Sequence, residues 1–168
     1  TTGMKDGGVQ QDQVESDGAM SVERFSLLTY NVAGLPEGLS GSKPESFIPL
    51  ISPLLNEYDL VLVQEDFWYH ALLIEDLEHP HQSPPMWEVP ELTEMGDGLN
   101  RFSIFPFDPL VRTQWVQCHG HLDCSNDCLA TKGFSVARTD LGGGALVDVY
   151  NLHMEAGGCP EDIVSRTA

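Results

Sequence analysis

The stretch LTYNVAGLP at residues 28–36 decides the fold, together with DLVLVQED at residues 59–66. The first is a short β-rich run that stops at Gly34 and Pro36, and its last polar side chain is Asn31. The second opens with an unbroken apolar run, which is typical of a strand buried on both faces, and leads into Glu65. Two such strands bring an amide and a carboxylate to one rim of a sheet, and a hard divalent cation prefers oxygen ligands of this kind.

Each of these residues alone has an ordinary interpretation, because an Asn after a strand is usually a turn residue and a single Glu is usually solvated. A third motif, DVYNLHMEAG at residues 148–157, places His153 directly after another apolar strand. In this order the motifs resemble those of the endonuclease/exonuclease/phosphatase superfamily, which includes deoxyribonuclease I, apurinic endonucleases, inositol phosphatases and neutral sphingomyelinases. The resemblance implies phosphoester hydrolysis, with Asn31 and Glu65 at a Mg²⁺ ion (Mn²⁺ or Ca²⁺ being alternatives) and His153 on the scissile phosphate.

Two further segments are similar to this family. GLNRFSIFPF at residues 98–107 resembles the strand beside the family's active site, and Asn100 and Arg101 are its polar positions expected to reach the site. KGFSVAR at residues 132–138 resembles a strand of bacterial-type neutral sphingomyelinases, which also begins with Lys-Gly. Lys132 is therefore expected to meet phosphate as a point charge, although a solvated lysine at a strand end is an equally ordinary interpretation.

The resemblance implies an α+β fold, a four-layer α/β/β/α sandwich of two mixed sheets, of which 24–168 would be the N-terminal part. The family's later motifs, an Asp-x-Asn after a strand and a Ser-Asp-His segment with the catalytic histidine, do not occur in these 168 residues. The chain by itself is thus not assumed to be active, and the rest of the domain is an expected partner. Residues 1–23 are rich in Gly, Gln, Asp and Ser and predict a flexible tail.

Periodicity predicts strands over 25–31, 59–64, 99–105, 110–117, 132–139 and 145–152, with a hairpin turn at 140–144. Apolar spacings of three and four predict helix within 42–58, but Pro49 and Pro53 do not suit a helix interior. Two short helical turns with a kink, or a helix that begins near Ser52, would be compatible with these prolines. A short helix is expected over 71–77, and another one starting at Pro160.

The charge of the chain argues against a general nuclease. The formal net charge is −18 and only eight Lys and Arg are present, whereas affinity for nucleic acids depends largely on such residues. A phospholipid is therefore the favoured phosphodiester. The resemblance to the lipid-cleaving branch of the family, whose apolar loops insert into membranes, makes Met86-Trp87 in the Pro-rich loop 79–95 a candidate for contact with a membrane surface. The alternatives are a secreted deoxyribonuclease-like enzyme and a truncated, non-catalytic member of the fold.

The cysteines predict an oxidising compartment, and hence an extracellular or secreted protein. Four are present, an even number, and three of them fall in one polar loop: Cys118, Cys124, Cys128 and Cys159. Three disulfide pairings are possible. A zinc site with His119 and His121 and free thiols are the alternatives. No apolar run is long enough to span a membrane.

Overall fold

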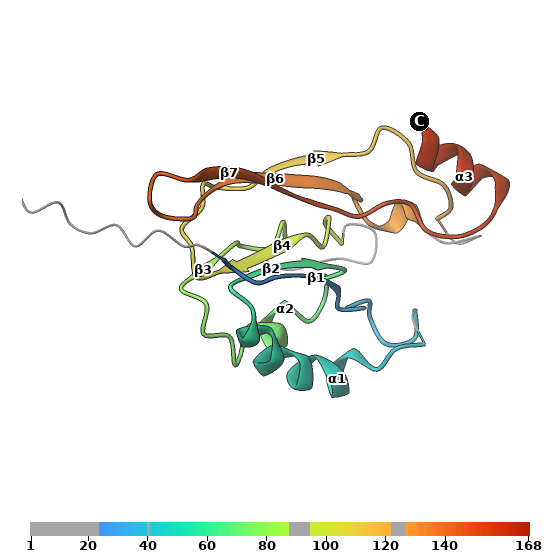
Figure 1. Ribbon diagram of the computed structural model, residues 1–168. Helices are drawn as coiled ribbons and strands as arrows, with labels where there is room; N and C mark the ends of the chain where they lie inside the picture. Colours follow the sequence, from blue (N-terminus) through green and yellow to red (C-terminus); the bar gives the residue numbers. More distant parts are fainter. Residues whose placement is uncertain (1–23, 40, 88–94, 122–126) are drawn as a thin grey trace, which may run out of the picture.

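Two β-sheets stacked face to face form the centre of the protein (Figure 1). The computed structural model describes residues 24–39, 41–87, 95–121 and 127–168. The first sheet has the order β1-β2-β4-β3, from β1 (Leu27–Asn31), β2 (Leu60–Gln64), β4 (Asn100–Ser103) and β3 (His81–Gln82). It is mixed, because β1 pairs parallel with β2 while the other pairs are antiparallel. The second sheet is antiparallel, in the order β5 (Val111–Gln114), β6 (Gly133–Asp140) and β7 (Leu146–Leu152).

Helices cover the outer face of the first sheet, where α1 (Pro44–Ile51) and α2 (His70–Leu73) lie beneath it in Figure 1. The 3₁₀ helix η1 (Ser52–Glu57) continues directly from α1. At one end of the second sheet lies α3 (Pro160–Thr167), near the short 3₁₀ helix η2 (Asp127–Leu129). The layers helix, sheet and sheet confirm the expected α+β sandwich.

The core lies between α1, α2 and the first sheet. All the apolar residues of β2 are buried, which explains their unbroken run in the sequence. Val61 and Val63 pack in one cluster with residues of the helices and of β4, namely Ile48, Leu55, Leu73 and Phe102. Each such side chain contributes roughly 1.5–3 kcal/mol through its burial. Leu60 and Leu62, the alternate residues of the strand, are buried as well, so the strand that leads to Glu65 is buried along its whole apolar length.

Two buried polar side chains join the sheets. Arg101 of β4 donates hydrogen bonds to the carbonyl of Val149 at 2.7 Å and to Thr139 Oγ1 at 3.3 Å, and its guanidinium lies 5.3 Å from the centre of the Phe107 ring. From the opposite sheet, Asn151 of β7 donates to the carbonyl of Val63 at 2.8 Å. These bonds fix the position of β7 relative to β2. They thereby also fix the position of His153, which follows β7, relative to Glu65, which follows β2.

The strands agree with the sequence prediction, and the helices differ in detail. Over 42–58 the chain forms an α-helix that contains Pro49 and then a 3₁₀ helix with Pro53 near its start, so the version with two short elements is confirmed. The helix predicted over 71–77 is the single turn α2, and the helix beginning at Pro160 is confirmed as α3. Strand β3 and the helix η2 were not predicted. The expected tail 1–23 and the cysteine at 124 lie outside the described residues.

Candidate active site

Asn31 and Glu65 meet at the shared end of β1 and β2. The parallel register pairs Asn31 with Gln64, so that Glu65 follows immediately at the same edge of the sheet. Asn31 Nδ2 donates to Glu65 Oε1 at 2.9 Å, and Asn31 Oδ1 accepts the backbone N–H of Ala33 at 2.9 Å. The amide of Asn31 therefore orients the carboxylate of Glu65 at one rim of the sheet, where the sequence predicts both groups.

The backbone at this edge is strained. Glu65 has a φ of 57° and Ala33 a φ of 50°, both in the left-handed region that residues other than glycine rarely adopt. Gly34 lies so close to Glu65 that a Cβ on Gly34 would be 2.6 Å from the Glu65 carbonyl oxygen. That oxygen accepts the N–H groups of Gly34 and Phe67, both at 3.0 Å. Such strain persists only where surrounding contacts hold it, and it clusters at functional sites.

Lys132 and His153 approach the same place from the second sheet. Lys132 precedes β6 and His153 follows β7, and the antiparallel pairing of these strands brings the two together. The His153 N–H donates to the Gly133 carbonyl at 2.9 Å. His153 Nε2 lies 3.5 Å from Glu65 Oε1, across the space between the sheets. The structure thus gathers Asn31, Glu65, Lys132 and His153 from segments far apart in the sequence.

A steric contact explains why a glycine follows Lys132. A Cβ on Gly133 would be 2.0 Å from the carbonyl oxygen of Thr113 in β5, so no other residue fits there without moving a backbone. The close approach lets β6 start directly against β5. Lys132 is consequently held at the sheet end and is buried, instead of being a solvated lysine at a strand end.

A cavity of about 330 Å³ opens at this point. Its polar wall is formed by Glu65, Asp127, Lys132 and His153. Its other wall is apolar and contains Leu35, Leu39, Phe67, Met95, Leu129 and Ala130. A charged centre directly beside an apolar wall suits a ligand that carries both a phosphate and a hydrocarbon part.

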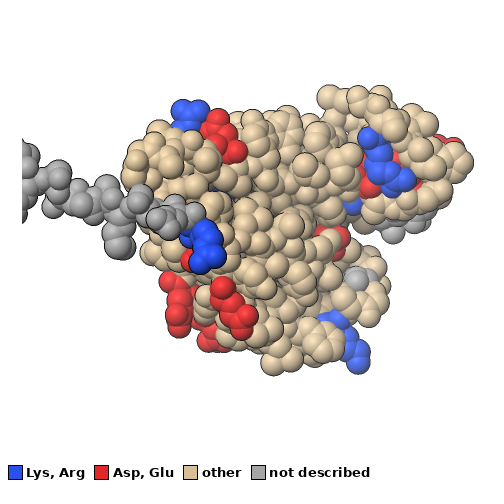
Figure 2. Space-filling view, in the orientation of Figure 1, with Lys and Arg blue, Asp and Glu red and all other residues tan. Residues whose placement is uncertain are grey.

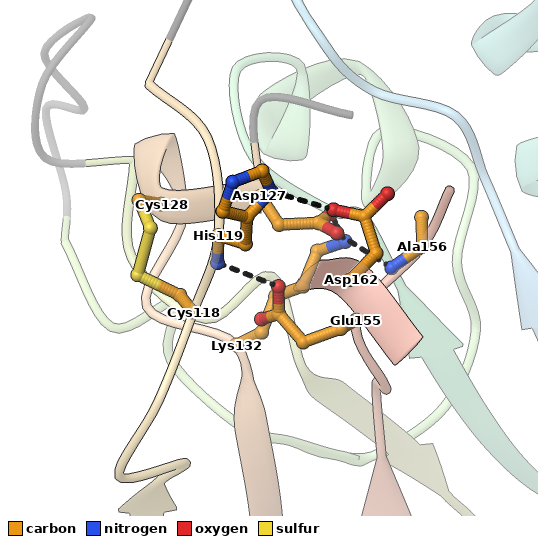
Figure 3. Close-up of a disulfide and its surroundings, with 8 residues drawn as sticks. All are labelled: Cys118, His119, Asp127, Cys128, Lys132, Glu155, Ala156 and Asp162. Atoms are coloured by element: carbon orange, nitrogen blue, oxygen red, sulfur yellow. Dashed lines mark hydrogen bonds and ion pairs between the residues drawn. A yellow bond between two sulfur atoms is a disulfide. The ribbon is translucent and has the colours of Figure 1, made fainter. Parts of the chain in front are cut away.

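Asp127 is a site residue that the sequence analysis missed. Its carboxylate accepts a hydrogen bond from Lys132 Nζ, and it accepts the N–H of Ala156 at 2.7 Å, which ties β6 to the segment after β7 (Figure 3). The disulfide Cys118–Cys128 closes the loop next to it. In the sequence, the feature that could have indicated this role is its position, five residues before Lys132 and directly before Cys128.

Burial, together with neighbouring charges, shifts the pKa of two groups near the cavity. The pKa of His153 is lowered, first by burial and then by the positive charge of Lys132, although the Glu65 and Asp127 carboxylates oppose this. The neutral imidazole is thus favoured, and it keeps one N–H donor. The pKa of Glu155 is raised, mainly by burial and next by the Asp127 carboxylate.

Asn100 and Arg101 do not reach the cavity, contrary to the expectation from the sequence. Both side chains are buried. Asn100 Nδ2 donates to Asp66 Oδ2 at 2.7 Å, one residue beyond Glu65, so that Asn100 supports the site from behind. Arg101 instead bonds the second sheet, and burial lowers the pKa of its guanidinium to about 10. The physical reason is the alternation along β4, which sends these two neighbouring side chains to opposite faces of the first sheet, Arg101 toward the second sheet and Asn100 toward Asp66.

The donor set at Glu65 fits a magnesium ion that keeps water and takes a substrate phosphate. Only Oε1 of Glu65 accepts a hydrogen bond among the described residues, which leaves Oε2 for a cation. No group of three or more His, Cys, Asp and Glu that could hold a metal occurs in the described part of the chain. One carboxylate with water and a substrate phosphate is a usual set of Mg²⁺ ligands, whereas a structural zinc site takes four Cys or His ligands.

The cysteines that the structure describes form disulfides, as the favoured interpretation predicts. Cys118 pairs with Cys128, and Cys159 is also disulfide-bonded. Their thiolates are therefore not available to zinc. Within the described residues, no helix is both long and apolar enough to cross a membrane.

The chain resembles known sphingomyelinases in sequence. It is 43% identical over 143 residues to a sphingomyelinase of Mycobacterium bovis and, equally, to one of Mycobacterium tuberculosis. The match covers 81% of this chain but only 28% of the length of each relative. No family model matches the chain.

Solved structures show the same fold. A structure named SmcL aligns with a TM-score of 0.66 at 20% identity, over 89% of this chain and 53% of that one. Sphingomyelinase C of Streptomyces griseocarneus aligns with a TM-score of 0.62 at 20% identity, over 85% and 55%. A beta toxin variant of Staphylococcus aureus with bound magnesium ions aligns with a TM-score of 0.63 at 21% identity, over 82% and 53%. At these identities the likeness concerns the fold alone.

Proposed function

Because the chain is a homologue of sphingomyelinases within the endonuclease/exonuclease/phosphatase superfamily, we propose that it carries the metal- and phosphate-binding residues of a Mg²⁺-dependent phosphodiesterase acting on sphingomyelin or a related phospholipid. The observation that carries the proposal is the meeting of Glu65, Lys132 and His153 from both sheets around one cavity with an apolar wall. The 43% identity to the mycobacterial sphingomyelinases supports the choice of substrate class.

Each residue has a distinct role in this proposal. Glu65, oriented by Asn31, would hold the cation. A bound Mg²⁺ polarises a phosphoryl oxygen and offsets the charge that grows on the phosphorus centre during hydrolysis. Lys132 supplies a positive charge to the phosphate, and Asp127 fixes its position. The neutral His153 donates a hydrogen bond to another phosphoryl oxygen, a bond that strengthens as charge builds in the transition state.

The charge of the surface favours a phospholipid over nucleic acid. On the face shown in Figure 2, positive side chains occur singly and form no continuous stripe. A duplex needs several Lys or Arg against its backbone, and the net charge of −18 works against such binding. Trp87 and Met86, both well exposed, could meet a membrane surface. A disulfide-bonded loop beside the site fits an extracellular enzyme.

A secreted deoxyribonuclease-like activity and a non-catalytic role remain the second candidates, and one assay separates them. With the longest natural form of the chain, release of phosphocholine from sphingomyelin vesicles and nicking of plasmid DNA are measured with Mg²⁺, Mn²⁺ or Ca²⁺ and with EDTA. Glu65→Gln and His153→Ala are compared with Glu57→Gln and His81→Ala, which lie outside the cavity. The proposal predicts lipid cleavage that EDTA and only the first pair abolish, by at least about 100-fold.

Two other results would contradict the proposal. Cleavage of DNA without cleavage of lipid would favour the nuclease. Phosphate binding without hydrolysis of either substrate, in the longest natural form of the chain, would favour a non-catalytic member of the fold.

A further inference from the structure

We propose that Trp115 is a positioning residue that fixes Lys132 and His153 relative to each other, an inference that rests on the proposed role of both residues at the phosphate. Trp115 follows β5 and lies outside the phosphate cavity, so it is not expected to touch substrate. Its two N–H groups, one of the backbone and one of the indole ring, bond the main chains of exactly those two residues.

The hydrogen bonds form a closed frame. The backbone N–H of Trp115 donates to the Lys132 carbonyl at 3.0 Å, and indole Nε1–H donates to the His153 carbonyl at 2.8 Å. The His153 N–H in turn donates to the Gly133 carbonyl at 2.9 Å. Trp115 thus connects the end of β5 with the end of β7 across β6, the central strand of this sheet.

The hydrogen bond from the Trp115 indole lies where the regular pairing of β7 with β6 stops. β7 ends at Leu152, and His153 is the first residue beyond it. A residue in that position has no further strand pairing to fix its carbonyl, so a side-chain donor takes over this function. The indole N–H is a donor only, and a half-buried one is normally bonded. The His153 carbonyl is the acceptor that the structure gives it.

The ring of Trp115 is itself held by packing. Its centre lies 5.6 Å from the ring of Phe134, which in turn lies 6.1 Å from the ring of Tyr150. These contacts fix the ring on the face of the second sheet. A catalytic group displaced by about 1 Å can lose about 100-fold in rate, so a rigid anchor behind His153 has a functional consequence.

The test compares Trp115→Phe with Phe134→Leu. The first keeps an aromatic ring and the backbone N–H but removes the indole donor, whereas the second disturbs the packing of the ring and keeps the donor. NMR spectra of the histidine rings report the placement of His153, and a titration with inorganic phosphate in the presence of Mg²⁺ reports binding at that ring. Thermal unfolding of both variants controls for stability.

Trp115→Phe is expected to shift or split the His153 ring signals and to weaken phosphate binding about two- to tenfold, the range for one hydrogen bond. Phe134→Leu is expected to change neither by a comparable amount at a similar melting temperature. Unchanged His153 signals in Trp115→Phe would overturn the proposal, and so would equal changes in both variants.

A measurement on the unaltered protein keeps the test decisive if Trp115→Phe does not fold. The indole N–H of Trp115 should exchange with solvent at least tenfold more slowly than that of the more exposed Trp87, and equal exchange would overturn the proposal. An unaltered protein that binds no phosphate near His153 would contradict the proposed function, while the ring signals would still decide the role of Trp115.

Discussion

Glu65 has a backbone conformation that is unfavourable for any residue with a Cβ. Its φ of 57° lies in the left-handed region, where a residue with a Cβ costs roughly 1–2 kcal/mol more than in the right-handed one. The β2 strand before it and the bonds of Gly34 and Phe67 to its carbonyl hold it there. This placement puts a carboxylate at the meeting point of the two sheets, at the expense of stability.

Glu65→Asn should therefore leave the free energy of unfolding unchanged or raise it by about 1 kcal/mol, because asparagine tolerates the left-handed region. The same change should abolish Mg²⁺ binding, since the ligand carboxylate is lost. Urea unfolding and isothermal titration with Mg²⁺ measure the two quantities. A loss of stability above about 1 kcal/mol, or Mg²⁺ binding as in the unaltered protein, would contradict this account.

The site residues were predictable where their position followed from a strand. Asn31 ends β1, while Glu65 and His153 follow β2 and β7 directly, and the structure brings the three together. Arg101, near the start of β4, was also expected at the site, yet it points between the sheets, because strand direction and register decide which way a side chain faces. Asp127 begins the three-residue 3₁₀ helix η2, which is too short to carry a periodic pattern that would indicate a role.

Glu155 makes the stability of the protein depend on pH. Its pKa is raised above 4.5, first by burial and then by the Asp127 carboxylate, so the folded protein keeps this proton longer than the unfolded chain does. Its contribution to stability is complete below pH 4.5 and is lost as the pH rises through the raised pKa. Glu155→Gln cannot titrate.

The melting temperature of the unaltered protein minus that of Glu155→Gln should therefore fall as the pH rises from 4.5 and then become constant. The two proteins are compared by calorimetry at several pH values between 4 and 8. A difference that does not change with pH would show that Glu155 titrates normally.

At the scale of elements, the strands were predictable and their contacts were not. Alternation and apolar runs indicate β1, β2, β6 and β7, but β3 has only two residues and carries no pattern of its own. The prolines at 49 and 53 correctly indicated a divided helix, since each removes a helical N–H. The contact between Gly133 and Thr113 depends on which strands become neighbours, and the sequence pattern does not encode it.

Gly133→Ala tests this contact. A methyl group there would meet the Thr113 carbonyl oxygen, so β5 and β6 must separate, and we expect a loss of about 1–3 kcal/mol in the free energy of unfolding. Phosphate binding should weaken as well, because Lys132 lies at this junction. Gly41→Ala is the matched control, since a Cβ at Gly41 meets nothing within 4 Å. Equal stability of the two variants in urea unfolding would contradict the steric explanation.

At the scale of the whole molecule, the site exists only because the two sheets are stacked in one orientation. Glu65 follows β2 of the first sheet, whereas Lys132 precedes β6 and His153 follows β7 of the second. The buried polar bonds between the sheets, above all those of Arg101, determine this orientation. Arg101, which the sequence suggested for phosphate binding, therefore holds the two sheets together.

Arg101→Met keeps much of the side-chain volume but leaves the carbonyl of Val149 and the hydroxyl of Thr139 without this donor. We expect a loss of about 2–4 kcal/mol in the free energy of unfolding, measured in urea. Arg138→Met is the control, because Arg138 pairs with Asp148 on the exposed surface and such pairs contribute little. If both variants lost the same stability, Arg101 would not link the sheets.

The central claim is that both sheets contribute to one metal- and phosphate-binding centre, and a crystal of the chain soaked with Mn²⁺ and phosphocholine tests it most directly. Mn²⁺ replaces Mg²⁺ at oxygen ligands and is visible by its anomalous scattering. The account predicts an anomalous peak at the Glu65 carboxylate, with the phosphate between that peak, Lys132 and His153. A metal bound away from Glu65, or phosphocholine bound without contact to Lys132 and His153, would contradict it.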